Sequence, residues 1–406
     1  MNSETLTINL GLFSSSVTAI LDHTHTHIFT HICVVMRAGD HGAAFSATPL
    51  RRSIDPAVLK HPSFLRDAAP TAMYVLYDLD RGVLCSTSTS KAERVVVAYR
   101  TFSDLTRVLE LHLGNDGVEA CSSGDGKCAP PYLLGKRSDD DTLAFVVDVT
   151  GCDTRAMETN DDCFIAVREL MTGPRTADDD TLVIVGLSHA IARWHASQRY
   201  CGYTGLKTAP IEGGLKRIAA SNLVAANGTK VKPTKLYPRV NPVAIMLVEN
   251  DAGTHCLLGR YHRAPEGMYT CLAGFVETCE RLEDACAREV YEESGVAIKA
   301  PRILNSQAWP VARGGHCELM VGMHAVAADR DGDTALPPVI FDGTEMEDVS
   351  WFSKTEVTRA LNVSRGAATP TESMDVKIKT VPGPFALAHW LIARWVDDEC
   401  AGAHKL

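Results

Sequence analysis

The sequence lacks the features that mark membrane proteins, secreted proteins and broad nucleic-acid binders. None of its apolar runs approaches the ~20 residues that a membrane-spanning helix needs. Residues 1–36 contain no Lys or Arg, which makes that segment a poor signal or transit peptide. A net charge of −10 and a pI of about 5.8 argue against binding along a phosphate backbone. These absences leave a globular class, which a hydrophobic content of 45% fits.

A disulfide framework is also missing. The 13 cysteines are odd in number and show no C-x-x-C spacing, so we interpret them as free thiols in a reducing compartment. The chain ends His404-Lys405-Leu406, which is similar to the S-K-L peroxisomal address with His in place of Ser. A peroxisome-like organelle and the cytoplasm therefore stand as alternative locations.

Histidines alternate in the N-terminal segment, at positions 23, 25, 27 and 31. On a strand this alternation would place their imidazoles on one face, where they could bind a metal ion. A disordered extension over residues 1–40, or a translation start at Met36, is the interpretation that we favour.

Residues 274–296 (GFVETCERLEDACAREVYEESGV) carry the strongest chemical signal in the chain. From Glu280 to Ser294 the segment is rich in Glu, Ala, Arg and Leu and contains no Pro or Gly, which predicts a helix. Gly295 stands where the C-terminal glycine of a helix belongs. The apolar residues of the segment fall near one side and are expected to anchor the helix to a sheet.

Another side of this predicted helix carries three glutamates. Glu289, Glu292 and Glu293 are related by three- and four-residue spacing, so their carboxylates share one face. Because like charges repel, the cluster favours bound cations, and hard oxygen ligands suit Mg²⁺ or Mn²⁺ rather than Zn²⁺. Arg288 is placed to reach back to Glu280 or Glu289 and fix its orientation. The alternative interpretation is an ordinary solvated helix face.

The same segment matches every fixed position of the Nudix box, G-x5-E-x7-R-E-U-x-E-E-x-G-U, in which U is aliphatic. The chain therefore resembles a Nudix hydrolase. The resemblance implies an α+β chain with a Nudix α/β/α sandwich as its catalytic domain, and magnesium or manganese as its metal. Metal ions would neutralise a diphosphate and lower the pKa of a bound water, and a carboxylate would take the water proton.

Segments around the box resemble the NADH pyrophosphatase (NAD⁺ diphosphatase) family, in order and spacing, over residues 185–395. They are WHASQRYCGY at 194–203, YPRVNPVAIM at 237–246, AGFVE at 273–277, SQAWP at 306–310 and ALAHWLI at 386–392. A fainter match, FSATPLRR at 45–52, resembles the start of the family's N-terminal domain. Dimerisation is implied by this resemblance alone, and the family's eukaryotic members are often peroxisomal.

This resemblance divides the chain into five expected parts. They are a disordered extension (1–40), a β-rich α+β NADH-pyrophosphatase-like domain (41–187), a connector (188–238), the Nudix domain (239–399) and a tail (400–406).

Local patterns predict secondary structure within these parts. We expect strands over 73–79, 94–100, 143–149 and 242–248, and a helix over 188–198. Pro384 suits the first turn of the last helix or the residue before it, so that helix is expected to start near Phe385 or Ala386.

Carried over residue by residue, the resemblance also implies a metal site. Its ligands would be the backbone carbonyl of Ala273 and the carboxylates of Glu289, Glu293 and Glu345, with Glu292 sharing the cluster. Glu345 is chosen because it lies six residues before Trp351-Phe352, as the family's distal glutamate precedes its aromatic pair; Glu347 competes for this role. The expected catalytic residues are Glu293, Glu345, Glu289 and Arg288, with Glu293 or Glu345 as the base.

The dinucleotide pocket implied by the resemblance is lined by Tyr237, Phe275, Gln307, Trp309, Pro310 and Ala388. Phe275 would stack on the nicotinamide, since an aromatic face stacks without needing hydrogen bonds to base edges. For Phe275, Trp309 and Tyr237, packing in the protein core is the alternative role.

The chain departs from the family at its zinc ribbon. Family members commonly carry four cysteines between the two domains. Here Cys201 is the first cysteine of the first pair, and Thr204 stands where the second cysteine of that pair belongs. The next cysteine in the sequence is Cys256. One thiolate cannot make a tetrahedral structural site, so we predict no zinc. Hydrophobic packing is then expected to hold residues 205–236.

The signature after Trp309 is also altered. Ala308, Val311 and Ala312 replace Pro, Phe and Pro of the family signature, and Arg313 and His316 follow as phosphate contacts or as exposed loop residues. The expected reaction is metal-dependent hydrolysis of the pyrophosphate bond of NADH or NAD⁺ to NMN(H) and AMP. Alternative substrates are ADP-ribose, FAD, diadenosine polyphosphates and the 5′ end of an NAD-capped RNA, and a nucleotide-binding sensor is the non-enzymatic alternative. No membrane partner is expected.

Overall fold

The structure is a computed structural model that describes residues 5–8, 17–20, 48–51, 54–61, 63–87, 94–108, 130–155, 158, 161–173, 176–219, 232–312, 316–328, 336–369 and 376–397. The chain divides into two compact units, Met1–His41 and Gly42–Leu406. In the first unit, β1 (Thr5–Ile8) pairs antiparallel with β2 (Val17–Ile20). The alternating histidines, Met36, Arg313 and the C-terminal tripeptide lie outside the described residues.

The N-terminal part of the second unit is built on an eight-stranded sheet of order β10-β6-β5-β4-β8-β7-β3, with β9 paired to β5. Its β4, β6 and β8 lie where the sequence predicts strands over 73–79, 94–100 and 143–149. The strands are β3 (Leu50–Arg51), β4 (Met73–Asp78), β5 (Gly82–Thr87), β6 (Arg94–Val97), β7 (Tyr132–Arg137), β8 (Leu143–Asp148), β9 (Asp162–Ile165) and β10 (Thr176–Ala177).

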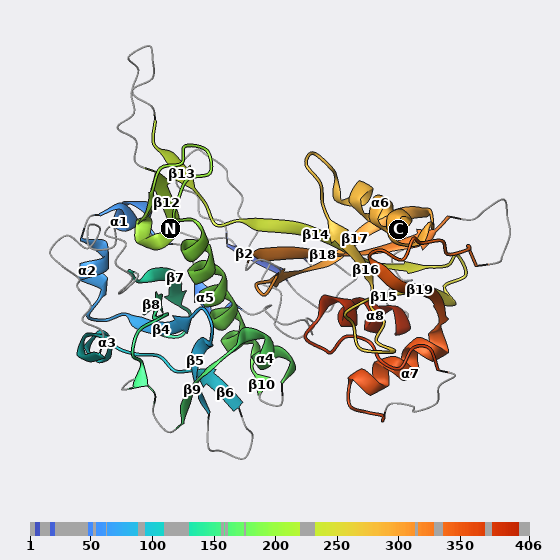
Figure 1. The fold of residues 1–406 in the computed structure, drawn as a ribbon, viewed down its shortest axis with the longest axis horizontal. Helices are drawn as coiled ribbons and strands as arrows, with labels where there is room; N and C mark the ends of the chain where they lie inside the picture. The colour runs from blue at the N-terminus through green and yellow to red at the C-terminus, as the bar shows by residue number, and fades with distance from the viewer. Residues whose placement is uncertain are drawn as a thin grey trace, which may run out of the picture. The chain divides into compact units, whose positions relative to one another are not determined.

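Helices cover both faces of this sheet. Leu59, Phe64 and Leu105 pack α1, α2 and α3 against one face, while Leu170 and Val185 pack α4 and α5 against the other. Figure 1 shows α5 running alongside the strands that it covers. The helices are α1 (Pro56–Lys60), α2 (Phe64–Ala68), α3 (Phe102–Val108), α4 (Val167–Thr172) and α5 (Asp179–Ser197).

Helix α5 begins nine residues before the helix predicted over 188–198. The side chain of Asp178 caps it by accepting the backbone N–H of Thr181, and Asp179 and Asp180 complement the helix dipole in its first turn. The sequence interpretation missed this cap. As a result, the expected boundary between domain and connector, at 187/188, falls inside one continuous helix.

The connector forms a three-stranded antiparallel sheet, and buried polar groups join it to α5. Arg217, 7% exposed, donates from Nη1 to Nδ1 of His195 (2.8 Å) and from Nε to Oγ1 of Thr208 (2.7 Å). The His195 ring stacks on Tyr132 with centroids 3.5 Å apart, and its Nε2 donates to the carbonyl oxygen of Gly214 (2.8 Å). The hydrophobic packing expected for residues 205–236 is therefore an incomplete description. The elements are β11 (Thr208–Ile211), the 3₁₀ turn η3 (Glu212–Gly214), β12 (Lys216–Ala219) and β13 (Thr234–Leu236).

His195 should make the protein less stable in acid. Burial, and then the charge of Arg217, lower the pKa of His195 to about 3 from its ordinary 6.5. The unfolded chain therefore binds the proton first, and the free energy of unfolding falls as pH drops from 6.5 toward 3, by at most ~1.4 kcal/mol per unit. Urea unfolding across this range measures the slope. His195→Gln keeps one donor and one acceptor but cannot titrate, so it should flatten the curve; parallel curves would contradict the prediction.

The C-terminal part is built on a six-stranded sheet of order β17-β18-β14-β15-β19, with β16 paired to β14. β14 and β18 are parallel, and the other pairs are antiparallel. The sequence predicts the strand over 242–248, which is the central part of β14. The strands are β14 (Val240–Glu249), β15 (His255–Tyr261), β16 (Leu272–Phe275), β17 (Ile298–Trp309), β18 (Cys317–Ala327) and β19 (Met346–Ser353).

Three helices complete an α/β/α sandwich, the arrangement expected from the sequence. Ala285 and Val290 pack α6 (Leu282–Ser294) on one face of the sheet. Helices α7 (Lys354–Ser364) and α8 (Leu387–Val396) pack on the other face through residues such as Leu361 and Leu391. Helix α8 begins at Leu387, with Ala386 as its N-cap, one residue beyond the start near Phe385 or Ala386 that Pro384 predicts. No helix in the described part of the chain is both long and apolar enough to cross a membrane.

An irregularity in the pairing of β15 with β19 shapes the edge of this sandwich. Arg260 lies opposite Asp348, but Tyr261 lies opposite Met346, so Glu347 is an extra residue on β19. Such a bulge re-aims the side chains around it. Here it turns Met346 to the face that Tyr261 already occupies, against the core under α6, with Glu345 directly before the strand.

Candidate active site

The glutamates of the box lie on α6 and on the turn that leads into it. The helix begins at Leu282, two residues later than predicted, and ends at Gly295 in the left-handed conformation (φ 70°). Glu280 therefore stands outside the helix. Two helical residues eight positions apart would be separated by ~12 Å along the axis, whereas a turn lets Glu280 fold back to Arg288.

Arg288 is the centre of a network that orients this segment. Its Nε and Nη2 donate to the two carboxylate oxygens of Glu280, both at 2.8 Å. Its Nη1 donates to Glu289 (2.8 Å) and Glu292 (2.9 Å), and Nη2 also donates to the carbonyl of Phe275 (2.9 Å). The sequence predicts contact with Glu280 or Glu289, and the structure shows both. A bidentate guanidinium–carboxylate pair is a strong geometric constraint.

Gly274 explains why the box begins with glycine. It lies on β16, paired with Ala244 of β14, and a Cβ at this position would overlap the carboxylate of Glu289. The side chain of Glu289 is buried against the strand, and burial, acting against its pairing with Arg288, raises its pKa. Glycine is required here for close approach and not for backbone freedom.

Glu293 is the most deeply buried carboxylate of the cluster, at 4% exposed. Its Oε2 accepts the backbone N–H of Ala273 (3.2 Å), and its Oε1 accepts the hydroxyl of Tyr261 (3.2 Å). Burial raises the pKa of Glu293 to about 8; the Tyr261 bond opposes this rise, and the charges of Glu289 and Glu345 add to it. A carboxylate buried beside two others is poised to bind a cation.

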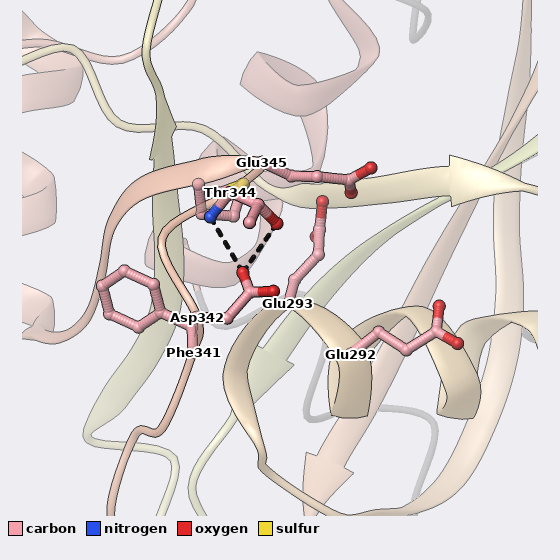
Figure 2. Close-up of a pocket in the computed structure, with 7 residues that line it drawn as sticks. Glu292, Glu293, Phe341, Asp342, Thr344 and Glu345 are labelled. Carbon is pink, nitrogen blue, oxygen red and sulfur yellow. Dashed lines mark hydrogen bonds between the residues drawn. The ribbon is translucent and has the colours of Figure 1, made fainter.

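A cavity of about 240 Å³ opens at the end of α6. Figure 2 shows the carboxylates of Glu293 and Glu345 pointing into the same space, while Glu292 points away. The Glu292 side chain is more than half exposed and is held by Arg288. The cavity is lined by Glu292, Glu293, Phe341, Asp342, Thr344, Glu345 and Met346.

The structure distinguishes the two candidates for the distal glutamate. Glu345 faces the cavity and raises the pKa of Glu293 through its charge. Glu347 instead forms an ion pair with Arg260 at 2.7 Å. The bulge at this point of β19 separates the two side chains, so that Glu345 lines the cavity while Glu347 pairs with Arg260.

This donor set fits a hard divalent cation. Glu289, Glu293 and Glu345 and the Ala273 carbonyl supply only oxygen atoms, which suits Mg²⁺ or Mn²⁺. Within the described residues, no three His, Cys, Asp or Glu side chains already converge on one point, and Arg288 holds an oxygen of Glu289. Glu293 and Glu345 thus face one cavity without yet converging, and Arg288 balances part of the charge of the cluster.

Comparison with known proteins identifies the fold. A family model described as NUDIX domain matches residues 239–372. This chain contains a Nudix domain. Its assignment to the NADH pyrophosphatase family rests on that Nudix domain and on relatives with names of that type.

Three relatives illustrate the assignment. Nudix hydrolase 19, chloroplastic, of Arabidopsis thaliana is 34% identical over 60% of this chain and 59% of its own length. The NAD-capped RNA hydrolase NUDT12 of Homo sapiens is 36% identical, over 52% of this chain and 41% of its own. The NAD(P)H pyrophosphatase NUDT13, mitochondrial, of Homo sapiens is 33% identical, over 53% and 55%. The chain spans about half the length of the relatives that it matches.

Residues expected to bind substrate lie in different environments. Phe275 and Tyr237 expose 53% and 59% of their surface, which argues against the core-packing alternative for these two rings. Trp309 packs beside the apolar cluster of the β-rich domain, and Ala388 is buried in α8. The buried amide of Gln307 bonds the carbonyl of Phe385 and the N–H of Leu387, so it holds the start of α8 in the Nudix domain.

Two residues beside the glutamate cluster were not predicted from the sequence. Tyr261 bonds both Ala273 and Glu293, and Asp342 lines the cavity while accepting both the N–H and the hydroxyl of Thr344. No spacing links these residues to the Nudix box, because strand pairing and a loop bring them to it. The only sequence signal for Tyr261 is its place at the end of an apolar strand.

Replacing each of the two candidate distal glutamates with glutamine, in separate variants, provides a matched test. Glu345→Gln should lower kcat for diphosphate hydrolysis by ~10²-fold or more, because it removes a carboxylate that faces the reacting groups. Glu347→Gln should change kcat less than ~3-fold, since it weakens only a half-exposed ion pair with Arg260. Steady-state kinetics of both variants under saturating Mg²⁺ make the comparison. The reverse order of effects would assign the distal ligand to Glu347.

Proposed function

We propose that this Nudix protein is a Mg²⁺- or Mn²⁺-dependent hydrolase that cleaves the pyrophosphate bond of NADH or NAD⁺ to NMN(H) and AMP. The observation that carries the proposal is that Glu293 and Glu345 face one cavity, with the carboxylate of Glu289 and the carbonyl of Ala273 close to Glu293. Relatives named NAD(P)H pyrophosphatase and NAD-capped RNA hydrolase support the choice of an NAD-type substrate.

The reaction joins a water oxygen to one phosphorus and breaks that phosphorus's bond to the bridging oxygen. Bound metal ions would neutralise the diphosphate and acidify the attacking water. Within the described residues, no hydrogen bond occupies the carboxylate of Glu345, whereas both oxygens of Glu293 accept one. Glu345 is therefore our choice as the base that takes the water proton, in addition to its place with Glu289 and Glu293 in the proposed set of metal ligands.

Arg288 and Phe275 have separate roles, one toward the glutamates and one toward the substrate. Arg288 compensates the charge of Glu289 and ties the box to the carbonyl of Phe275. The exposed ring of Phe275 lies at the end of β16, one residue beyond Gly274, and offers a stacking face for the nicotinamide. Tyr237, Trp309, Pro310 and Ala388 are proposed to complete the dinucleotide pocket, with Gln307 holding α8 beside it.

A second substrate, the 5′ end of an NAD-capped RNA, is favoured by the relatives that carry that name. Ala308, Val311 and Ala312 replace the Pro, Phe and Pro of the family signature. These replacements remove ring surface that would select a free dinucleotide. A net charge of −10 limits the contact to the cap and the nucleotides next to it. Peroxisomal location and homodimerisation stay predictions of the sequence.

Chromatographic product analysis tests the proposal. The protein is incubated with Mg²⁺ or Mn²⁺ and equal concentrations of NADH, NAD⁺, ADP-ribose, FAD, a diadenosine polyphosphate or a short NAD-capped RNA. We expect NMNH and AMP from NADH at the highest rate. Cleavage of another diphosphate with NADH intact would keep the chemistry and replace the substrate, while no cleavage of any would leave a nucleotide-binding protein.

A further inference from the structure

The hydroxyl of Tyr261 lies between two of the proposed metal ligands. It is 3.3 Å from the carbonyl oxygen of Ala273 and 3.2 Å from Oε1 of Glu293. The other oxygen of Glu293 accepts the N–H of Ala273 at 3.2 Å. Hydroxyl, carboxylate and one main-chain residue therefore form a closed set of contacts between β15, β16 and α6.

We propose that Tyr261 is a positioning residue that holds the Ala273 carbonyl and the Glu293 carboxylate at the distance and orientation that one divalent cation requires. This inference rests on the proposed metal-dependent function. A phenol hydroxyl has a single proton, so it donates to only one of the two oxygens at a time. Tyr261 thus orients both oxygens while leaving each with lone pairs for a cation.

The backbone supports this role. The extra residue Glu347 on β19 brings Tyr261 opposite Met346, on the face of the sheet that α6 covers. The ion pair between Glu347 and Arg260 lies at this bulge. Without the bulge, alternation along β19 would place Met346 on the opposite face, away from Tyr261.

The carboxylates around this hydroxyl show why a positioning group is needed. Glu293 is 4% exposed and faces the charges of Glu289 and Glu345. Repulsion among three carboxylates would turn an unrestrained side chain away from the cavity. A hydrogen bond from a partly buried ring that packs in the core opposes that rotation before the cation arrives.

Tyr261→Phe tests the proposal, with Tyr269→Phe as the matched control. Tyr269 is another phenol of the Nudix domain, more deeply buried than Tyr261, and its hydroxyl donates to Asp348 (2.5 Å). Mn²⁺ binding is measured by electron paramagnetic resonance of the free ion, apart from any activity. We expect Tyr261→Phe to weaken Mn²⁺ binding ~10-fold or more and Tyr269→Phe to leave it unchanged. At saturating Mn²⁺, kcat of Tyr261→Phe should recover to within ~3-fold of the parent, a split between metal affinity and turnover that general loss of structure does not produce.

Equal Mn²⁺ affinity in the parent and in Tyr261→Phe would overturn the proposal. Because that measurement needs no substrate, it separates failure of this inference from failure of the diphosphatase function. If Tyr261→Phe does not fold, 3-fluorotyrosine at position 261 keeps the ring and hydroxyl and reports by ¹⁹F NMR. Its resonance should shift on addition of Mg²⁺, while 3-fluorotyrosine at position 269 should not; a resonance at 261 that ignores Mg²⁺ would refute the role.

Discussion

Glu293→Gln is expected to abolish diphosphate hydrolysis, with a loss in kcat of ~10³-fold or more. The variant removes the negative charge of the most buried carboxylate in the cluster but keeps its size. In one amide orientation its oxygen still accepts the Ala273 N–H, and its NH2 donates to the Tyr261 hydroxyl, which can donate to the Ala273 carbonyl. Because the parent carboxylate is buried beside Glu289 and Glu345, a neutral amide relieves repulsion, and the variant should unfold at a temperature no lower than the parent.

Two measurements together test this prediction. The parent should gain thermal stability on addition of Mn²⁺, and Glu293→Gln should gain less, because ligand binding to the folded state stabilises it. Glu283→Gln, which changes a glutamate on the first turn of the same helix, is the control and should retain parental kinetics and metal response. Hydrolysis of NADH by Glu293→Gln at the parental rate would show that the metal site lies elsewhere.

Gly274→Ala is expected to cost ~10²-fold or more in kcat/KM, although it adds a single methyl group. That methyl would occupy the space of the Glu289 carboxylate. Glu289 must move, and its contact with Arg288 (2.8 Å) must move with it. Overpacking of this kind also destabilises a domain, by about 1–3 kcal/mol.

A control and a double variant separate the steric cause from a general effect of alanine. Gly202→Ala adds a methyl where nothing lies within 4 Å and should leave both activity and stability unchanged. Gly274→Ala combined with Glu289→Ala should recover thermal stability without recovering activity, because the clash is removed and the ligand is still missing. Full activity in Gly274→Ala alone would mean that Glu289 is not held where the structure places it.

The comparison of sequence and structure shows which parts of the site are local. The helix that ends at Gly295 and the contact of Arg288 with Glu280 and Glu289 follow from spacing within a single segment. The start of α8 follows from Pro384 in the same way. The earlier start of α5 could also have been predicted from the N-cap residue Asp178 and the acidic residues after it.

The buried polar network of the connector could not be predicted from local spacing. His195 and Arg217 are 22 residues apart, and Tyr132 lies on a strand of another sheet. Loss of the cysteine pairs predicted that hydrophobic packing would hold the connector. Only the packing of these three elements shows that a buried arginine also holds the connector.

The sequence by itself determined that this chain contains a Nudix domain with a glutamate helix, because helix periodicity and capping act over a few residues and leave a regular pattern. Only the tertiary structure decided that Gly274 must lack a side chain, that Glu345 and not Glu347 faces the cavity, and that Tyr261 joins the cluster. Each of these depends on strand pairing or on a bulge, which brings together residues separated by 15 to 88 positions. Such contacts have no fixed spacing, since pairing register is set by the packing of the whole sheet.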